Sequence, residues 1–577
     1  MARSTPPRSK VHGKTHDHAA PETPAEPAKP ATPPPAPPSD LWAGKPELKA
    51  SMPKETKDRK VRVRMYRQGL GDCFLLRFPG VNDKDYHVLI DCGVVIGTPN
   101  ANQIMKEVVA DLDRTTGGRI DLLVGTHEHW DHLSAFDPAA KLFEKFDIGE
   151  VWLAWTEDPN NRVASSLRAE RQKRLRTLWM GLDRLRAEFA AADAPPQGAR
   201  EAVDTASEIL GFFGIDMSVD RPPSAPSGAP AAAGGGREAD SPLDRTGRAM
   251  QWLRDGASQN VQFRKPGEDF VLHEASGVRV YVLGPPTNLE LLRKDLPTSA
   301  GKETYEFDEK AFDALEKAFF GGLNLQSDAS RALNRSRPFD QKYQVREEDA
   351  KDVEFYRDHY YGTGDPDRDA WRWIASEWVD AASSLALKLD SDTNNTSLAL
   401  AFELPDGRVL LFPGDAQVGN WESWHVDDDG KPRVWQVEGR QVTAESLLKQ
   451  TVLYKVGHHG SHNATLREKG LEMMNDTNLT ALVPVDTFVA HVKKRWKKMP
   501  FDPLMKRLEE RAEQRVILAD GPLPKDWNVP GASLADGGIP FTTTFISLGE
   551  NDTEGPAKER PLYVEIEMDF VEKKGKK

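Results

Sequence analysis

Apolar and polar residues alternate with a period of two in several short stretches, the pattern of strands with one buried face. Residues 61–66 alternate in this way, and 71–78 and 87–93 follow as further apolar runs. A run at 120–124 predicts the strand that leads into a histidine-rich segment. Apolar residues at helical spacing predict a helix before that strand, and they are Ile104, Met105, Val108, Val109 and Leu112. The chain therefore begins a sheet with a helix packed on it.

Strand-like patterns return later, with two long interruptions. The first interruption, 157–270, contains a helical repeat and a Pro/Gly-rich loop at 221–242, which we expect to be flexible. The second, 287–390, is mainly helical. The later strands are expected at 277–284, 396–403, 408–412, 452–456, 480–485, 515–519, 542–548 and 562–568, with a helix at 503–515. We expect an α/β fold with two mainly helical inserts.

Two sets of residues in these inserts allow more than one interpretation. Trp371, Trp373 and Trp378 indicate core packing or an interface rather than base stacking. A basic face on the first insert's helix could contact phosphates, but a solvated face is the favoured interpretation. Its members are Arg168, Arg171, Lys173, Arg174, Arg176, Arg184 and Arg186.

Composition narrows the classes of function. With 577 residues and a formal net charge of -13, the chain is unsuited to broad non-specific binding of nucleic acid. Its two cysteines, Cys73 and Cys92, lie in apolar runs and suit a reducing compartment. We expect a cytoplasmic protein, with neither signal peptide nor membrane span. Residues 1–58 are rich in Pro and Ala and are expected to form a disordered tail.

Metal-binding residue types follow the predicted strands at three places. Imidazole nitrogen and carboxylate oxygen are ligands for zinc and similar divalent ions. Because strand ends in a layered α/β fold share one rim, these segments can converge on a dinuclear site. The candidates are His127, His129, Asp131 and His132, then Asp415, then His458, His459 and His462.

These motifs resemble the metallo-β-lactamase superfamily, and within it the hydrolase domain of the competence protein ComEC and its soluble relatives. The likeness is carried by the HxHxDH motif at 127–132 and by the segments 71–72, 89–93, 395–398, 413–415 and 455–461. It covers roughly 60–156, 270–286 and 394–550. The resemblance implies a four-layer αββα sandwich over 59–577, interrupted by the two inserts.

The resemblance also implies two divalent ions, zinc or alternatively manganese. His127 and His129 would hold the first ion, Asp131 and His132 the second, and Asp415 would bridge them. His459 would complete the second site, with His458 as the alternative. Residues expected to support the ligands without binding metal are Asp72, Asp91, Asn394 and Asn395. One of the two asparagines stands where the family usually has the first ion's third ligand, a histidine.

The implied nucleophile is a metal-bound hydroxide. Asp131 or Asp415 could orient it, and Ser461 and His462 could bind a phosphate oxygen or protonate a leaving group. Ser461 could equally stabilise its turn. A local basic run around Trp496 could track a nucleic-acid backbone, or could be a solvated loop. Its members are Lys493, Lys494, Arg495, Lys497 and Lys498.

We therefore expect a metal-dependent phosphodiesterase or nuclease. A hydrolase of small esters, lactams or nucleotides is the alternative enzyme. A further possibility is an effector regulated by a protein partner that binds the inserts and the tail.

Overall fold

The computed structural model describes residues 59–81, 84–191, 197–220, 245–294, 347–360, 374–522, 524, 527–535, 540–543 and 558–571. All of them belong to one compact unit, 56–577. The predicted tail, the loop 221–242, Trp371 and Trp373 lie outside the described residues. So does most of the second insert.

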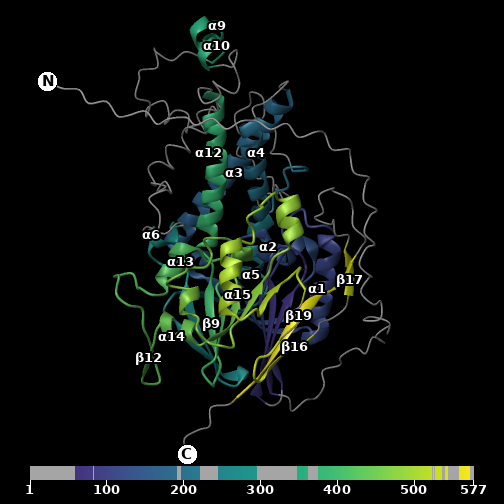
Figure 1. Ribbon diagram of the computed structural model, residues 1–577, viewed down its shortest axis with the longest axis vertical. Coiled ribbons are helices and arrows are strands. Elements are labelled where there is room, and N and C mark those ends of the chain that lie inside the picture. The colour runs from purple at the N-terminus through teal and green to yellow at the C-terminus, as the bar shows by residue number, and fades with distance from the viewer. Residues whose placement is uncertain are drawn as a thin grey trace, which may run out of the picture. The chain divides into compact units, whose positions relative to one another are not determined.

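Two large sheets form the centre of this unit (Figure 1). The eight-stranded sheet has the spatial order β16 (Ala532–Ala535), β19 (Tyr563–Asp569), β1 (Lys60–Tyr66), β2 (Cys73–Pro79), β3 (Asp85–Cys92), β4 (Arg119–Gly125), β5 (Asp147–Ala154) and β6 (Val261–Arg264). The seven-stranded sheet has the order β15 (Val516–Leu518), β14 (Thr480–Val483), β13 (Thr451–Lys455), β10 (Val409–Phe412), β9 (Ala399–Glu403), β8 (Val278–Gly284) and β7 (Asp269–Leu272). Two short hairpins add β11 (Trp435–Val437) with β12 (Arg440–Val442), and β17 (Pro540–Thr543) with β18 (Lys558–Pro561).

Both sheets are mixed. In the first, β3, β4, β5 and β6 run parallel to one another, and the remaining pairs are antiparallel. In the second, β10, β13, β14 and β15 are parallel. The predicted α/β class is thereby confirmed.

The alternation along the strands places one set of side chains between the two sheets. In β9, Leu400 and Phe402 enter the core that both sheets share, whereas Ala399 and Ala401 face the opposite side. Aromatic pairs join the sheets across this core, such as Phe74 with Phe412, whose ring centroids lie 5.6 Å apart. The sheets therefore pack face to face.

A second core lies on the other face of the eight-stranded sheet, where α1 (Ala101–Thr116), α2 (Trp130–Leu133) and α5 (Arg245–Asp255) pack. The predicted helical residues Ile104, Val108 and Leu112 are buried there, so this helix is confirmed. It ends at Gly117, whose φ of 65° is the left-handed conformation typical of a helix C-terminus.

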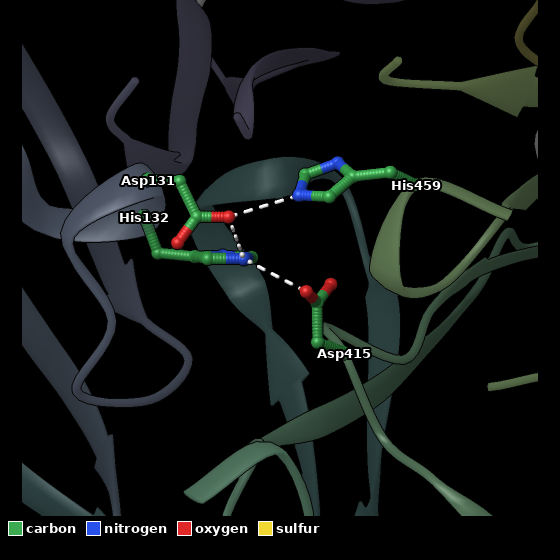
Figure 2. Close-up of side chains that lie close together, drawn as sticks. All are labelled: Asp131, His132, Asp415 and His459. Carbon is green, nitrogen blue, oxygen red and sulfur yellow. Dashed lines mark hydrogen bonds and ion pairs between the residues drawn. The ribbon is translucent and has the colours of Figure 1, made fainter. Parts of the chain in front are cut away.

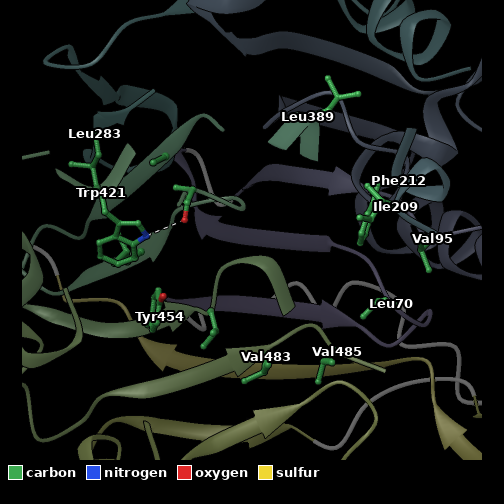
Figure 3. Packing of buried hydrophobic residues seen from close by; sticks show 14 of the residues in the cluster. Leu70, Val95, Ile209, Phe212, Leu283, Leu389, Trp421, Tyr454, Val483 and Val485 are labelled. Carbon is green, nitrogen blue, oxygen red and sulfur yellow. Dashed lines mark hydrogen bonds between the residues drawn. The ribbon is translucent and has the colours of Figure 1, made fainter. Parts of the chain in front are cut away.

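The third core covers the other face of the seven-stranded sheet. Figure 3 shows part of it, including Leu389, Phe212 and Tyr454, which come from three different regions of the sequence. Its long helices α3 (Arg162–Ala191), α4 (Gln197–Leu210) and α12 (Ile374–Asn394) lie side by side (Figure 1). Shorter helices are α6 (Leu289–Leu292), α9 (Glu347–Asp352), α10 (Glu354–Tyr360), α13 (Val418–Ser423), α14 (Ala444–Lys449) and α15 (Asp502–Arg511). None of the helices in the described part of the chain has both the length and the apolar character needed to cross a membrane.

The inserts differ from the sequence prediction at their edges. Sheet structure resumes at β6 and β7, inside or at the end of the segment 157–270 that was predicted as an insert. Each of these strands has only four residues, so neither is long enough for an alternation to be recognised.

The basic face of α3 is largely bonded within the protein. Arg171 pairs with Glu128, Arg174 with Glu170 at 2.6 Å, and Arg186 donates to the carbonyl of Met217 at 2.8 Å. These three arginines are therefore engaged within the protein, whereas Lys173 and Arg176 are exposed, as a solvated face predicts.

A buried histidine in β3 gives a stability prediction. Burial lowers the pKa of His87 to about 4, and its Nε2 has no hydrogen-bond partner. An unfolded chain protonates this imidazole near pH 6.5, so it binds more protons than the native state between pH 6.5 and 4. The free energy of unfolding should therefore fall as pH falls through this window, by about 3 kcal/mol more than in His87→Gln. Urea unfolding at several pH values measures this difference. The prediction would be contradicted if the free energy of unfolding changed with pH in the same way in the wild type and in His87→Gln.

Candidate metal centre

Three loops bring the candidate ligands together, and each follows a strand. β4 leads into Thr126 and α2, β10 leads into Gly414 and Asp415, and β13 leads into the 3-10 turn η11 (His458–Gly460). The side chains of Asp131, His132, Asp415 and His459 lie around one point although β4 and β13 belong to different sheets (Figure 2). The convergence expected from the strand ends is therefore present.

The four residues of Figure 2 form the best-defined candidate site. One ligand atom from each, all within 4.8 Å of one another, could contact a common ion. His459 Nε2 lies 2.9 Å from Asp131 Oδ2, and His132 Nε2 lies 3.1 Å from Asp415 Oδ2. All four residues are completely buried. We call them the Asp131 centre.

The outer nitrogen of each histidine in the Asp131 centre already has an acceptor. His132 Nδ1 lies 2.8 Å from Asp91 Oδ2, and His459 Nδ1 lies 2.7 Å from the carbonyl of Pro484. A carbonyl can only accept, so Nδ1 of His459 carries the proton and a neutral ring presents a lone pair at Nε2. Such outer contacts are typical of metal-binding histidines.

Several atoms at the centre are buried without a hydrogen-bond partner, namely His132 Nε2, Asp131 Oδ1 and Asp415 Oδ2. Leaving carboxylate oxygens and imidazole nitrogen unsatisfied in the interior costs free energy unless a cation contacts them. The donor set of two imidazoles and two carboxylates suits zinc or manganese. The residues thus fit a divalent ion.

His127 and His129 form a separate pair beside this centre. His127 Nε2 and His129 Nδ1 are 3.0 Å apart, and His127 Nδ1 lies 3.0 Å from Thr126 Oγ1. In the described part of the chain, neither histidine belongs to a group of three or more clustered donors. The pair supplies two of the ligands expected for the first ion.

Asp91 orders the histidine loop through two contacts with Thr126. Its Oδ1 accepts the backbone N–H of Thr126 at 2.8 Å, and its Oδ2 accepts the hydroxyl at 2.6 Å. Together with the bond from His132, these contacts occupy both oxygens. Asp91 therefore lies where a supporting residue is expected and does not face the Asp131 centre.

Lys455 is a residue of the site that the sequence reasoning missed. Its Nζ lies 2.5 Å from Asp72 Oδ2 and 2.9 Å from Asp415 Oδ1, and it also donates to the carbonyl of Gly414 at 2.8 Å. Asp72, Asp91 and His132 form a second cluster of potential donors, but the ammonium already neutralises part of its charge. The sequence feature that could have identified Lys455 is its place as a charged residue inside the apolar run 452–456.

Buried charges set the protonation of the residues in and beside the centre. Burial would lower the pKa of His132 and of His459, yet Asp415 and Asp131 raise that of His132 well above its ordinary value, and the hydrogen bond to Asp131 raises that of His459. Burial would raise the pKa of Asp415, yet Lys455 and His132 hold it well below its ordinary value. Burial, with the neighbouring His132, lowers the pKa of His127 well below the ordinary value, and burial lowers the pKa of His129 to about 3. At neutral pH, Asp415 is therefore ionised and these two imidazoles are neutral, as metal binding requires.

His458 and His462 occupy different environments. His458 is buried and donates its backbone N–H to Asp415 Oδ1 at 2.9 Å, and burial lowers the pKa of its imidazole to about 4. Its Nδ1 lies 3.1 Å from Ser461 Oγ, whose hydroxyl donates to Asn463, while its Nε2 has no partner. His462 is exposed and packs on Phe501, with ring centroids 5.9 Å apart.

The two asparagines predicted to support the site have different roles. Asn395 Oδ1 accepts from the backbone N–H of Gln417 at 3.2 Å, so it joins the loops outside the metal ligands. Asn394 donates to Asp390 Oδ2 at 3.1 Å. Asp390 was missed, and the only signal in the sequence was its helical spacing with Asn394. Its Oδ1 lies 3.8 Å from His129 Nε2, and burial raises the pKa of Asp390 well above its ordinary value.

Only part of the basic run is directed inward. Lys494 is buried, whereas Lys493, Arg495 and Lys497 are exposed. Arg495 pairs with Asp204 of α4 at 3.2 Å. Trp496 stacks on Phe212, with ring centroids 4.9 Å apart and an interplanar angle of 12°, so it is packed and does not offer a free face there.

The first insert covers the histidine loop. Phe212 and Phe213, in η6 (Gly211–Phe213), contact the ring of His129 at centroid distances of 5.5 and 4.8 Å. Glu128 pairs with Arg171 of α3 and lies 3.3 Å from the hydroxyl of Thr246 in α5. The insert helices therefore bind the loop that supplies the ligands.

Comparison of the chain with protein-family models, with curated proteins and with solved structures finds no match.

Replacing Lys455 by methionine tests its role as a fixed charge. The substitution leaves Asp72 and Asp415 buried without their cation, and breaking a buried ion pair costs about 3–5 kcal/mol. The free energy of unfolding of Lys455→Met, measured with urea at pH 7 in a chelator, should fall by about this amount. Lys449→Met removes an exposed pair with Glu445, which solvent screens, and should lower the free energy of unfolding far less. Equal losses in the two variants would contradict the assignment.

Proposed function

We propose that the chain is a metal-dependent hydrolase of the metallo-β-lactamase superfamily, similar to the ComEC-like hydrolases. The observation that carries the proposal is the Asp131 centre: four buried candidate ligands from three loops, three of which have a side-chain atom without a hydrogen-bond partner. The HxHxDH motif supports the assignment. Two facing sheets with helices against both outer faces support the four-layer αββα arrangement.

Two ions are proposed, with zinc or manganese as the candidates. Asp131, His132, Asp415 and His459 would hold one of them, and His127 with His129 would hold the other. The chemistry that such ions supply is the acidification of water and the neutralisation of charge on phosphate oxygens.

The protein's own groups would orient the reaction. Asp131 and Asp415 would accept hydrogen bonds from the attacking water, because each has a buried oxygen without a partner. His458 Nε2 is a further candidate ligand or base, since Ser461 already accepts the proton of its Nδ1. His462 stands at the surface beside Ser461, so it would contact a leaving group only if the substrate extends to that surface.

Phosphodiesters are the proposed substrates, and nucleic acid is the proposed polymer. The exposed Lys493 and Lys497 could contact backbone phosphates next to the buried Lys494. Burial lowers the pKa of Lys494, and the carboxylates of Glu208, Asp216 and Asp131 partly offset this effect.

A small-molecule hydrolase is the second candidate. It is favoured by the cover that Phe212 and Phe213 form over His129, because a covered site suits a compact ester, lactam or nucleotide better than a polymer. Regulation by a protein partner and a cytoplasmic location stay predictions.

The function is tested by turnover and metal content together. Metal-free protein is supplied with Zn²⁺ or Mn²⁺ and given single- and double-stranded DNA, RNA, a chromogenic phosphodiester, a carboxylic ester and a lactam. Cleavage of the phosphodiesters is expected, and Asp415→Asn should lower its rate at least about 100-fold. The same variant should lose about one of two bound ions per chain, as counted by elemental analysis.

His273→Asn is the matched control, because His273 is exposed and outside the centre. It should keep both the metal and the rate. Cleavage of the ester or lactam alone would favour the second candidate. Equal, metal-independent behaviour of the wild type and Asp415→Asn on every substrate would refute the proposal.

A further inference from the structure

Asp390 of α12 extends from the second insert to the histidine loop. It is 6 % exposed, and its Oδ2 accepts from Asn394, one helical turn further along. Its Oδ1 has no hydrogen-bond partner, and neither has the nearest imidazole nitrogen, Nε2 of His129, at 3.8 Å. Two buried polar atoms of complementary type thus face each other.

The surroundings give Asp390 no other evident role. In the part of the chain that the structure describes, no lysine or arginine lies within ion-pair distance of its carboxylate. A buried carboxyl without a cation costs free energy, and a purely structural position would tolerate an apolar residue better. The position of Asp390 next to His129 therefore suggests a role at the candidate metal site.

The positions of the protons on His127 and His129 indicate what this role of Asp390 could be. The hydroxyl of Thr126 donates to Asp91, so Thr126 Oγ1 accepts from Nδ1 of His127. A neutral His127 then has its lone pair on Nε2, which faces Nδ1 of His129 at 3.0 Å. If His129 carries its proton on Nε2, towards Asp390, two lone pairs converge, and a cation between them removes their repulsion.

In the other histidines around the site, the ring nitrogen that points away from the site has an acceptor beside it. The outer nitrogen of His127 faces Thr126, that of His132 faces Asp91 at 2.8 Å, and that of His459 faces the Pro484 carbonyl at 2.7 Å. Among these outer nitrogens, Nε2 of His129 alone has no acceptor within hydrogen-bond distance, and the carboxyl group of Asp390 lies beside it. A shift of under about 1 Å would bring the pair into hydrogen-bond range.

We propose that Asp390, held by Asn394, is a positioning residue that accepts the Nε2 proton of His129 and so directs Nδ1, together with His127 Nε2, towards the first ion. The inference rests on the proposed function, because it presupposes a metal ion at this pair. It makes the second insert part of the metal site: α12 supplies a group that completes the histidine loop from outside the HxHxDH motif.

Cobalt titration tests the inference without an activity assay. Co²⁺ is added to the metal-free full-length chain, and the two affinities are measured by competition with a chelator, with the visible absorption of bound cobalt as the signal. The wild type should bind two ions. Asp390→Ala should bind one of them about 10–100-fold more weakly and the other unchanged, because loss of an outer acceptor typically costs that factor.

Two further variants separate positioning from folding. Asp390→Asn keeps the shape and one acceptor oxygen, so it should lose less affinity than Asp390→Ala. Asp392→Asn alters the same helix at a carboxylate paired with Lys388 at 2.9 Å, and it should bind both ions as the wild type does. Circular dichroism on each variant checks the fold.

The outcomes distinguish this inference from the function on which it rests. Wild-type affinity for both ions in Asp390→Ala would overturn the role of Asp390 and leave the hydrolase proposal intact. An equal loss in Asp392→Asn would assign the effect to the helix as a whole and would also overturn it. Failure of the wild type to bind any cobalt would overturn the metal centre itself, and the inference with it.

Discussion

The structure depends on how charge is balanced where the two sheets present their loops. Asp72, Asp131 and Asp415 are buried there with several imidazoles, in an interior where an isolated carboxylate is unfavourable. Lys455 supplies one permanent positive charge, bonded to Asp72 and Asp415. Asp415 Oδ2, Asp131 Oδ1 and His132 Nε2 have no hydrogen-bond partner. The charge of the site is therefore partly neutralised by the protein, and its remaining donor atoms could hold a cation.

This balance requires strands that are distant in sequence to end at the same place. β4 carries its ligands on one sheet, and β10 and β13 carry theirs on the other. The shared apolar core between the sheets, with contacts such as Phe74 to Phe412, fixes the distance between these ends. Asp131 and His459 thereby reach 2.9 Å across the interface of the two sheets.

The inserts contribute to the site as well as covering it. Helices α3 and α5 hold Glu128 between His127 and His129, and η6 packs its aromatic rings on His129. Helix α12 brings Asp390 to the same imidazole. Both inserts therefore place side chains next to the imidazole of His129.

Periodicity and spacing in the sequence were sufficient to predict the α/β class, the helix around Val108 and the three loops that carry the candidate ligands, because these are local properties of 4–8-residue patterns. Local patterns cannot specify which polar atoms become buried opposite each other. The pairing of Lys455 with Asp415, the inward turn of Lys494, the exposure of His462 and the approach of Asp390 to His129 were decided by tertiary packing. Each depends on the distance between elements 40 or more residues apart or on the burial of one side of a loop, and only the folded chain determines these.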